Sequence, residues 1–139
     1  MNELEHKLFA KALENLYGSV LLGEDQALAY VEHLIHLNRA LGDAAHCRWP
    51  LAGEAELIRR VQEACWPERA LEIRLEEGLP AALCVGREAL FAPVCRLLLE
   101  AAEAGGFPTA LELGRREGVL EYRLLLGTEV WRRGVVDHG

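Results

Sequence analysis

Histidine side chains are the strongest candidates for chemistry in this sequence, and the first of them is His6. It falls in the first turn of a helix that apolar periodicity predicts over residues 2–22. A neutral imidazole is a nucleophile near neutral pH. The free N–H groups and positive dipole end of a helix start favour a phosphoryl anion and a neutral ring. His6 therefore suits transfer of an anionic group. The alternative is a packed or frayed terminal histidine on the arc of Ala10, Leu13 and Tyr17.

A second pair of histidines, His33 and His36, lies one turn apart on the polar arc of a helix predicted over residues 25–41. The two are rival candidates for the same chemistry, or half of a metal site. Two helical histidines without a third ligand known to lie nearby are a weak metal signal. His46 and Cys47 follow the helix, but a hairpin of this length places them away from His33. We therefore favour a solvated polar face and expect no metal or other cofactor.

Nucleophiles other than histidine find little support. Ser19 is the only serine, and no cysteine has a histidine predictably facing it. The cysteines form neither a CxxC metal knuckle nor a dense disulfide framework, and they are Cys47, Cys65, Cys84 and Cys95. We predict reduced, mostly buried thiols and no hydrolase chemistry.

The length and charge of the chain limit its size class and its partners. The chain has 139 residues, the length of one ordinary domain, and 51% of them are hydrophobic. An aliphatic core can therefore form without disulfide bonds. Lys and Arg total 15 against 22 Asp and Glu, which gives a formal net charge of −7. Because this charge repels a phosphate backbone, we expect no nucleic-acid partner.

Patterns for export and membrane insertion are also lacking. The N-terminal MNELEHK contains two acids before any apolar run, whereas a secretory signal has a basic start and an apolar stretch. The most apolar window, residues 79–85, is far shorter than the roughly 20 residues that a membrane helix requires. We expect a cytoplasmic protein that has no membrane partner.

Two amphipathic helices, over residues 2–22 and 25–41, open the chain. The apolar residues of the first helix recur every four positions, at Leu8, Ala12, Leu16 and Val20. Asn2 and Glu5 have the spacing of a capping box with asparagine at the cap. So short a connection makes the helices an antiparallel hairpin, which we assign to residues 1–46. Each helix has an apolar arc too wide for one neighbour to cover, so we expect the hairpin to form a homodimer.

Residues 47–139 change to a mixture of helical and strand patterns. In chain order we predict a helix near residues 54–65, a strand over 71–76, a helix over 87–104, and a β-hairpin with strands over 109–115 and 119–126. The Gly105-Gly106 pair ends the second of these helices, and a Glu117-Gly118 turn joins the two strands of the hairpin. The expected fold class is α+β, a helical hairpin followed by a small two-layer α/β sandwich with its helices on one face of the sheet.

Three segments resemble the cytoplasmic core of the LytS-like sensor histidine kinases. Residues 5–15, EHKLFAKALEN, are similar to that family's motif PHFLFNALN, with His6 at the histidine and one extra residue in the alignment. Residues 49–65, WPLAGEAELIRRVQEAC, are similar to the segment VxLxxELxLIxxYL after the family's hairpin. Residues 91–106, FAPVCRLLLEAAEAGG, are similar to its ATP-binding helix, LLQPLVENAIKHG. The resemblance implies a dimerising histidine hairpin, an ATPase-like module and a response regulator as partner.

The nucleotide site of that family is not retained. Glu100 is kept, but Ala101 stands at the magnesium-binding asparagine, and no glycine box follows the strand over 119–126. A nucleotide site needs an oxygen ligand for magnesium and glycine-rich backbone around the phosphates. The resemblance therefore implies a truncated, degenerate ATPase-like module without ATP hydrolysis or autokinase activity. That combination is similar in logic to the sporulation phosphotransferases of bacilli.

Two functions follow as expectations. The first is a two-component signalling protein that acts as a phosphotransfer or response-regulator-docking module, with His6 as the phosphoacceptor and His33 and His36 as rivals. The second, of a different class, is a non-catalytic homodimeric interaction or inhibitor protein that binds a partner protein. Labelling of His6 by a phosphorylated receiver distinguishes the two.

Overall fold

The computed structural model describes residues 2–21, 27–43, 49–80 and 83–137 of the chain. Within those ranges there are four helices and six strands, and the α+β fold class is confirmed. In chain order the elements are α1 (Glu3–Leu21), α2 (Ala27–Asp43), β1 (Trp49–Pro50), α3 (Leu51–Cys65), β2 (Glu72–Leu75), β3 (Cys84–Val85), α4 (Phe91–Ala104), β4 (Ala110–Arg116), β5 (Val119–Leu126) and β6 (Glu129–Val135).

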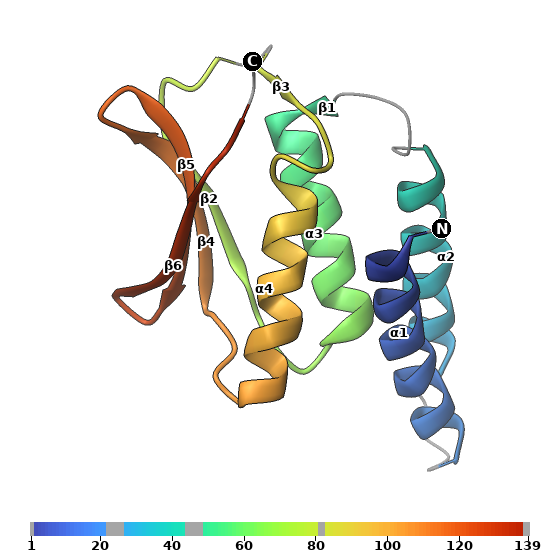
Figure 1. Ribbon diagram of the computed structural model, residues 1–139. Helices are drawn as coiled ribbons and strands as arrows, with labels where there is room; N and C mark the ends of the chain where they lie inside the picture. The colour runs from blue at the N-terminus through green and yellow to red at the C-terminus, as the bar shows by residue number, and fades with distance from the viewer. Residues whose placement is uncertain (1, 22–26, 44–48, 81–82, 138–139) are drawn as a thin grey trace.

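The elements form three layers (Figure 1). One layer is a sheet in the order β2-β4-β5-β6, in which β2 runs parallel to β4 and the other neighbours are antiparallel. Helices α3 and α4 cover one face of this sheet, as the sequence predicts. The hairpin of α1 and α2 packs against the opposite side of α3, and α1 also reaches α4. A short antiparallel pair of β1 and β3 lies at one end of α3.

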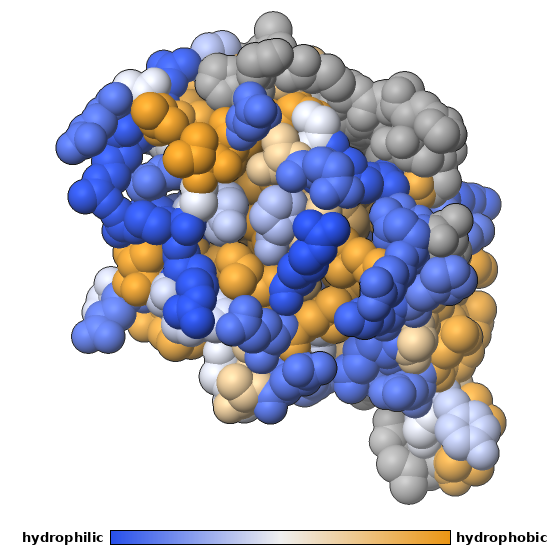
Figure 2. Space-filling view, in the orientation of Figure 1, coloured by the Kyte–Doolittle hydropathy of each residue, from blue (hydrophilic) through white to orange (hydrophobic). Residues whose placement is uncertain are grey.

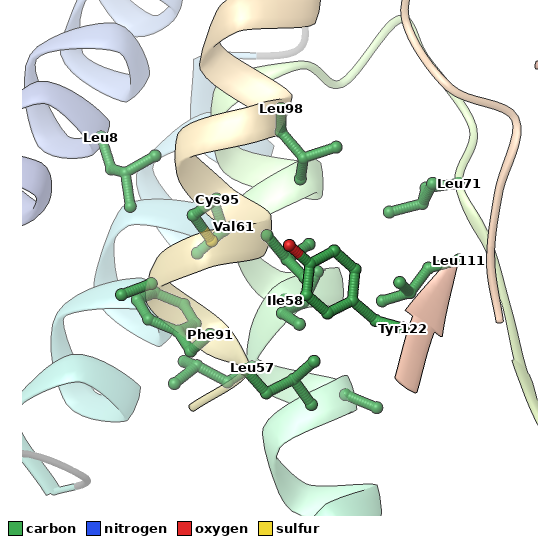
Figure 3. Packing of buried hydrophobic residues seen from close by; sticks show 14 of the residues in the cluster. Leu8, Leu57, Ile58, Val61, Leu71, Phe91, Cys95, Leu98, Leu111 and Tyr122 are labelled. Atoms are coloured by element: carbon green, nitrogen blue, oxygen red, sulfur yellow. The ribbon is translucent and has the colours of Figure 1, made fainter. Parts of the chain in front are cut away.

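One hydrophobic core runs through all three layers. Leu111 and Tyr122 extend from the sheet towards α3, where Ile58 and Val61 are fully buried. Leu8 of α1 is fully buried on the other side of α3 and α4 (Figure 3). These residues belong to a single buried cluster. The hairpin therefore buries one of its faces against its own chain.

The predicted β-hairpin is confirmed, and its turn explains the register of the sheet. Glu117 and Gly118 have φ angles of 55° and 79°. Two consecutive left-handed residues are typical of the type I′ turn, whose twist suits a two-residue hairpin. Because a residue with φ near 80° favours glycine, Gly118 is the natural second residue of the turn.

Strand β6 was not predicted. It pairs with β5 through a second tight turn at Gly127, whose φ is 64°. The register shifts between Leu124 and Leu125, so the strand contains a β-bulge. A bulge and the adjacent charges of Arg132 and Arg133 remove the alternation by which strands are recognised in a sequence.

The four-residue apolar repeat of α1 does not lie on one face of the helix. Leu8 and Ala12 are buried and Leu16 is half-buried, but Val20 is 61% exposed. A residue four positions along an α-helix is rotated by roughly 40°, so three such steps turn Val20 by about 120° from Leu8. The expected single arc is therefore two faces, one inside the molecule and one outside.

Candidate functional site

The side chain of His6 is exposed in the first turn of α1. The predicted N-cap, formed by Asn2 and Glu5, is present at this helix start. The Glu5 N–H donates to Asn2 Oδ1 at 2.9 Å, and Asn2 Nδ2 donates to Glu5 Oε1 at 3.4 Å. The His6 N–H donates to the Asn2 carbonyl at 3.0 Å, the start of the regular helical ladder. The cap thus fixes the helix start, while the His6 side chain is exposed.

We expect Asn2→Ala to lower the free energy of unfolding by about 1 kcal/mol, the usual cost of removing an N-cap acceptor. Urea denaturation of both proteins is the measurement. Asn2→Asp keeps the acceptor oxygen and serves as the control, with little change expected. Equal stability of Asn2→Ala and the wild type would show that the cap contributes nothing.

Arg87 connects the first turn of α1 to the rest of the molecule through hydrogen bonds. Its Nη1 donates to Glu5 Oε1 at 3.0 Å, and its Nη2 donates to the Leu41 carbonyl near the end of α2 at 3.2 Å. The Arg87 and Glu5 side chains are only 12% and 13% exposed, so solvent screens the ion pair little. The guanidinium also lies 5.4 Å from the centre of the Phe91 ring. The orientation of the His6-bearing turn is therefore set from the loop before α4.

A groove of about 480 Å³ runs between the start of α1 and the exposed side of α4. Its lining is mostly charged and consists of Asn2, Glu3, Leu4, Lys7, Glu88, Arg96, Leu99, Glu100 and Glu103. Lys7 pairs with Glu3 at 3.5 Å and Arg96 with Glu88 at 3.7 Å, both on the surface. Surface ion pairs of this kind contribute little to stability, so their side chains can pair with a binding partner instead. The groove is open to a polar partner, and His6 is not part of its lining.

The two rival histidines lie on α2, whereas His6 lies on α1. His36 is exposed, and its Nδ1 is 3.5 Å from Arg60 Nη1 of α3. His33 is half-buried beside Tyr30, with the ring centres 6.1 Å apart, and its Nδ1 is buried without a hydrogen-bond partner among the described residues. The polar arc of α2 thus turns partly towards α3 instead of facing only solvent.

No metal centre is formed within the part of the chain that the structure describes, where no three His, Cys, Asp or Glu side chains gather suitably. His46 and Cys47 lie outside the described residues. Cys65 and Cys95 are free and buried, as expected, and Cys84 is half-buried. Burial raises the pKa of the Cys65 thiol to about 12, so this thiol stays protonated at neutral pH.

The helix that resembles the ATP-binding helix is α4, and its two key positions point in different directions. Glu100 is exposed and pairs with Arg132 of β6 at 3.6 Å. Ala101 is fully buried in the apolar interior. A side chain at position 101 therefore faces the core, where a magnesium ion and phosphates would be desolvated without compensation.

An apolar surface on the hairpin was not located from the sequence. We call it the outward face, and it consists of Leu13, Tyr17, Val20 and Leu21 of α1 with Leu28, Val31 and Ile35 of α2, all of them exposed. In Figure 2 apolar residues appear along the free edge of the hairpin on the right. The wide apolar arcs were the available signal, but only the docking against α3 decides which part of each arc stays outside. Arg87 was also missed, because a single arginine has no pattern.

Comparison with known protein families finds no match, and no curated protein or solved structure is significantly similar to this chain. Among the described residues, no helix is both long enough and apolar enough to cross a membrane.

Proposed function

We propose that the protein is a cytoplasmic two-component signalling protein that acts as a phosphotransfer or response-regulator-docking module, with His6 as the phosphoacceptor. The observation that carries the proposal is the exposed His6 in a capped first turn of α1. The imidazole is accessible to a partner, and the turn that presents it is held by Arg87. The likeness of residues 5–15 to the histidine motif of sensor kinases supports the same role.

The chemistry requires only the histidine from this chain. A neutral ring nitrogen of His6 attacks the phosphorus of an aspartyl phosphate on the regulator. The P–N bond forms as the P–O bond to the aspartyl carboxylate breaks, and the carboxylate leaves. The regulator supplies the magnesium that offsets the charge of the phosphoryl oxygens. The positive end of the α1 dipole then favours the phosphorylated ring.

The same proposal excludes autokinase activity and ATP hydrolysis. Ala101 offers no oxygen to magnesium, and its side chain is fully buried. No glycine box follows β5, because Gly127 is followed by Thr128 and Glu129 at the turn into β6. The α/β layers then serve as a scaffold that positions the hairpin.

We expect the protein to act as a homodimer through the outward face of the hairpin. Soluble monomers rarely expose so many large apolar side chains together. Since α1 and α2 are antiparallel neighbours, their exposed rows lie side by side, and a second hairpin related by twofold symmetry offers the same rows. Two hairpins would then enclose these side chains in a four-helix arrangement.

The second candidate function is a non-catalytic interaction or inhibitor protein. The outward face favours it, because an apolar surface can hold a partner protein whether or not His6 is chemically active. His6 would then be an exposed terminal residue without a reaction. The labelling experiment separates the two functions.

We expect His6→Gln to abolish acid-labile labelling by a panel of receiver domains phosphorylated with radiolabelled acetyl phosphate. The exposed side chain contributes little to the core, so circular dichroism and dimerisation should be unchanged. His33→Gln and His36→Gln are the matched controls and should keep the label. Loss of label only in one of these would move the site to α2, and a wild type that no receiver labels would favour the interaction protein.

A further inference from the structure

A buried acidic side chain, Glu54, lies on α3 outside the site described above. Glu54 belongs to the first turn of α3 and is only 1% exposed. Both of its carboxylate oxygens are buried without a hydrogen-bond partner among the described residues. Buried carboxylates without partners are rare, because the loss of hydration is not compensated.

Glu54 and Arg87 lie on neighbouring segments, because the loop that carries Arg87 follows β3, and β3 pairs with β1, the strand that leads directly into α3. Burial raises the pKa of the Glu54 carboxyl, and the positive charge of Arg87 acts on the same group in the opposite direction. Arg87 has an unused donor of its own, since its Nε is buried without a partner among the described residues. Its other two nitrogens hold Glu5 and the Leu41 carbonyl. One guanidinium thus binds a carboxylate on α1 and acts electrostatically on a carboxylate on α3 that has no hydrogen-bond partner among the described residues.

We propose that Arg87 is a two-position latch between the hairpin and the α/β layers. In the state described here it binds Glu5 of α1 and the end of α2. When the start of α1 moves away, Arg87 turns to Glu54, which then supplies the missing carboxylate. Breaking a buried ion pair is normally costly because it leaves a buried charge without a partner. A second acceptor removes that cost and lets the His6-bearing turn leave the body of the molecule without unfolding it.

The latch does not depend on phosphoryl transfer at His6. It rests on the contacts of Arg87 and on the unpartnered oxygens of Glu54, and it also applies if the protein only binds a partner. A partner that binds the first turn of α1 and moves it away would favour the second position, in which Arg87 pairs with Glu54. The expected consequence is local opening of the hairpin ends while the sheet stays folded.

The test is a double-mutant cycle on the full chain with Glu5→Gln and Glu54→Gln, followed by thermal unfolding. Glu54→Gln alone should leave the midpoint unchanged or raise it, because it removes a buried carboxylate without a partner. In the Glu5→Gln background the same substitution should lower the midpoint, because Arg87 then loses both carboxylates. An effect of Glu54→Gln that is equal in the two backgrounds would overturn the latch. Glu3→Gln, which removes an exposed charge from the same turn, is the control. Its effect on the midpoint should simply add to that of Glu54→Gln.

Amide hydrogen exchange gives a second readout that needs only Glu54→Gln. If Glu54 stabilises the open position, its replacement should slow exchange in residues 3–8 by about tenfold, the factor expected for a hydrogen bond to a charged group. Exchange in β4 and β5, which reports global unfolding, should have the same rate as in the wild type. Unchanged exchange in residues 3–8 would contradict the latch even if Glu5→Gln failed to fold.

Discussion

Replacing Gly134 by alanine is expected to lower the free energy of unfolding by about 3 kcal/mol, the upper part of the usual range for overpacking. Gly134 of β6 lies opposite Tyr122 of β5 in the sheet. A Cβ atom at position 134 would lie 2.5 Å from Cε2, Cζ and the hydroxyl oxygen of Tyr122. The Tyr122 side chain is buried among the core residues and has little room to retreat. The edge strand β6 should therefore detach at this point.

Chemical denaturation of the wild type and Gly134→Ala measures the effect. Gly106→Ala is the matched control, because a Cβ at position 106 meets nothing within 4 Å, and its effect should stay within about 0.5 kcal/mol. Tyr122→Leu shortens the opposing side chain, so the double variant should lose less than the sum of the single changes. A fully stable Gly134→Ala protein would show that Tyr122 does not fill this space.

Replacing Tyr17 by glutamate is expected to convert a homodimer into a monomer. Tyr17 lies in the outward face of the hairpin and is 67% exposed in a single chain, so the substitution should not disturb the fold. In a twofold dimer each copy would bring a charge into the apolar interface, where it has no water. We expect the dissociation constant to rise at least about a hundredfold, which corresponds to about 3 kcal/mol.

Light scattering over micromolar concentrations measures the molar mass, which for one chain is 15.5 kDa. Val119→Glu is the control, since Val119 is an exposed apolar residue on β5, outside the hairpin. It should leave the dimer intact. A wild type that is monomeric throughout this range would remove the homodimer from the proposal, and a Tyr17→Glu dimer would move the interface elsewhere.

The local elements of this protein follow from its sequence because their signals are local. Asn2 and Glu5 form the predicted cap, and Gly105 ends α4 with a φ of 81°. The turn of Glu117 and Gly118 joins β4 and β5 as expected. Each of these depends on the backbone preferences of a few neighbouring residues. The boundaries of α3 and α4 shift by a few residues, because helix ends also respond to what packs against them.

The sequence by itself determined the α+β class, the helical hairpin and the place of His6 at a helix start. Only the tertiary structure decided which apolar residues of α1 are inside, since Leu8 and Val20 share one repeat but not one face. It also decided that Arg87, in the loop before α4, pairs with Glu5 of α1 and acts electrostatically on Glu54 of α3. The physical reason is the sequence separation of the interacting residues. Caps and turns are set by neighbours along the chain, whereas burial and buried charge pairs depend on contacts between distant segments, which periodicity does not encode.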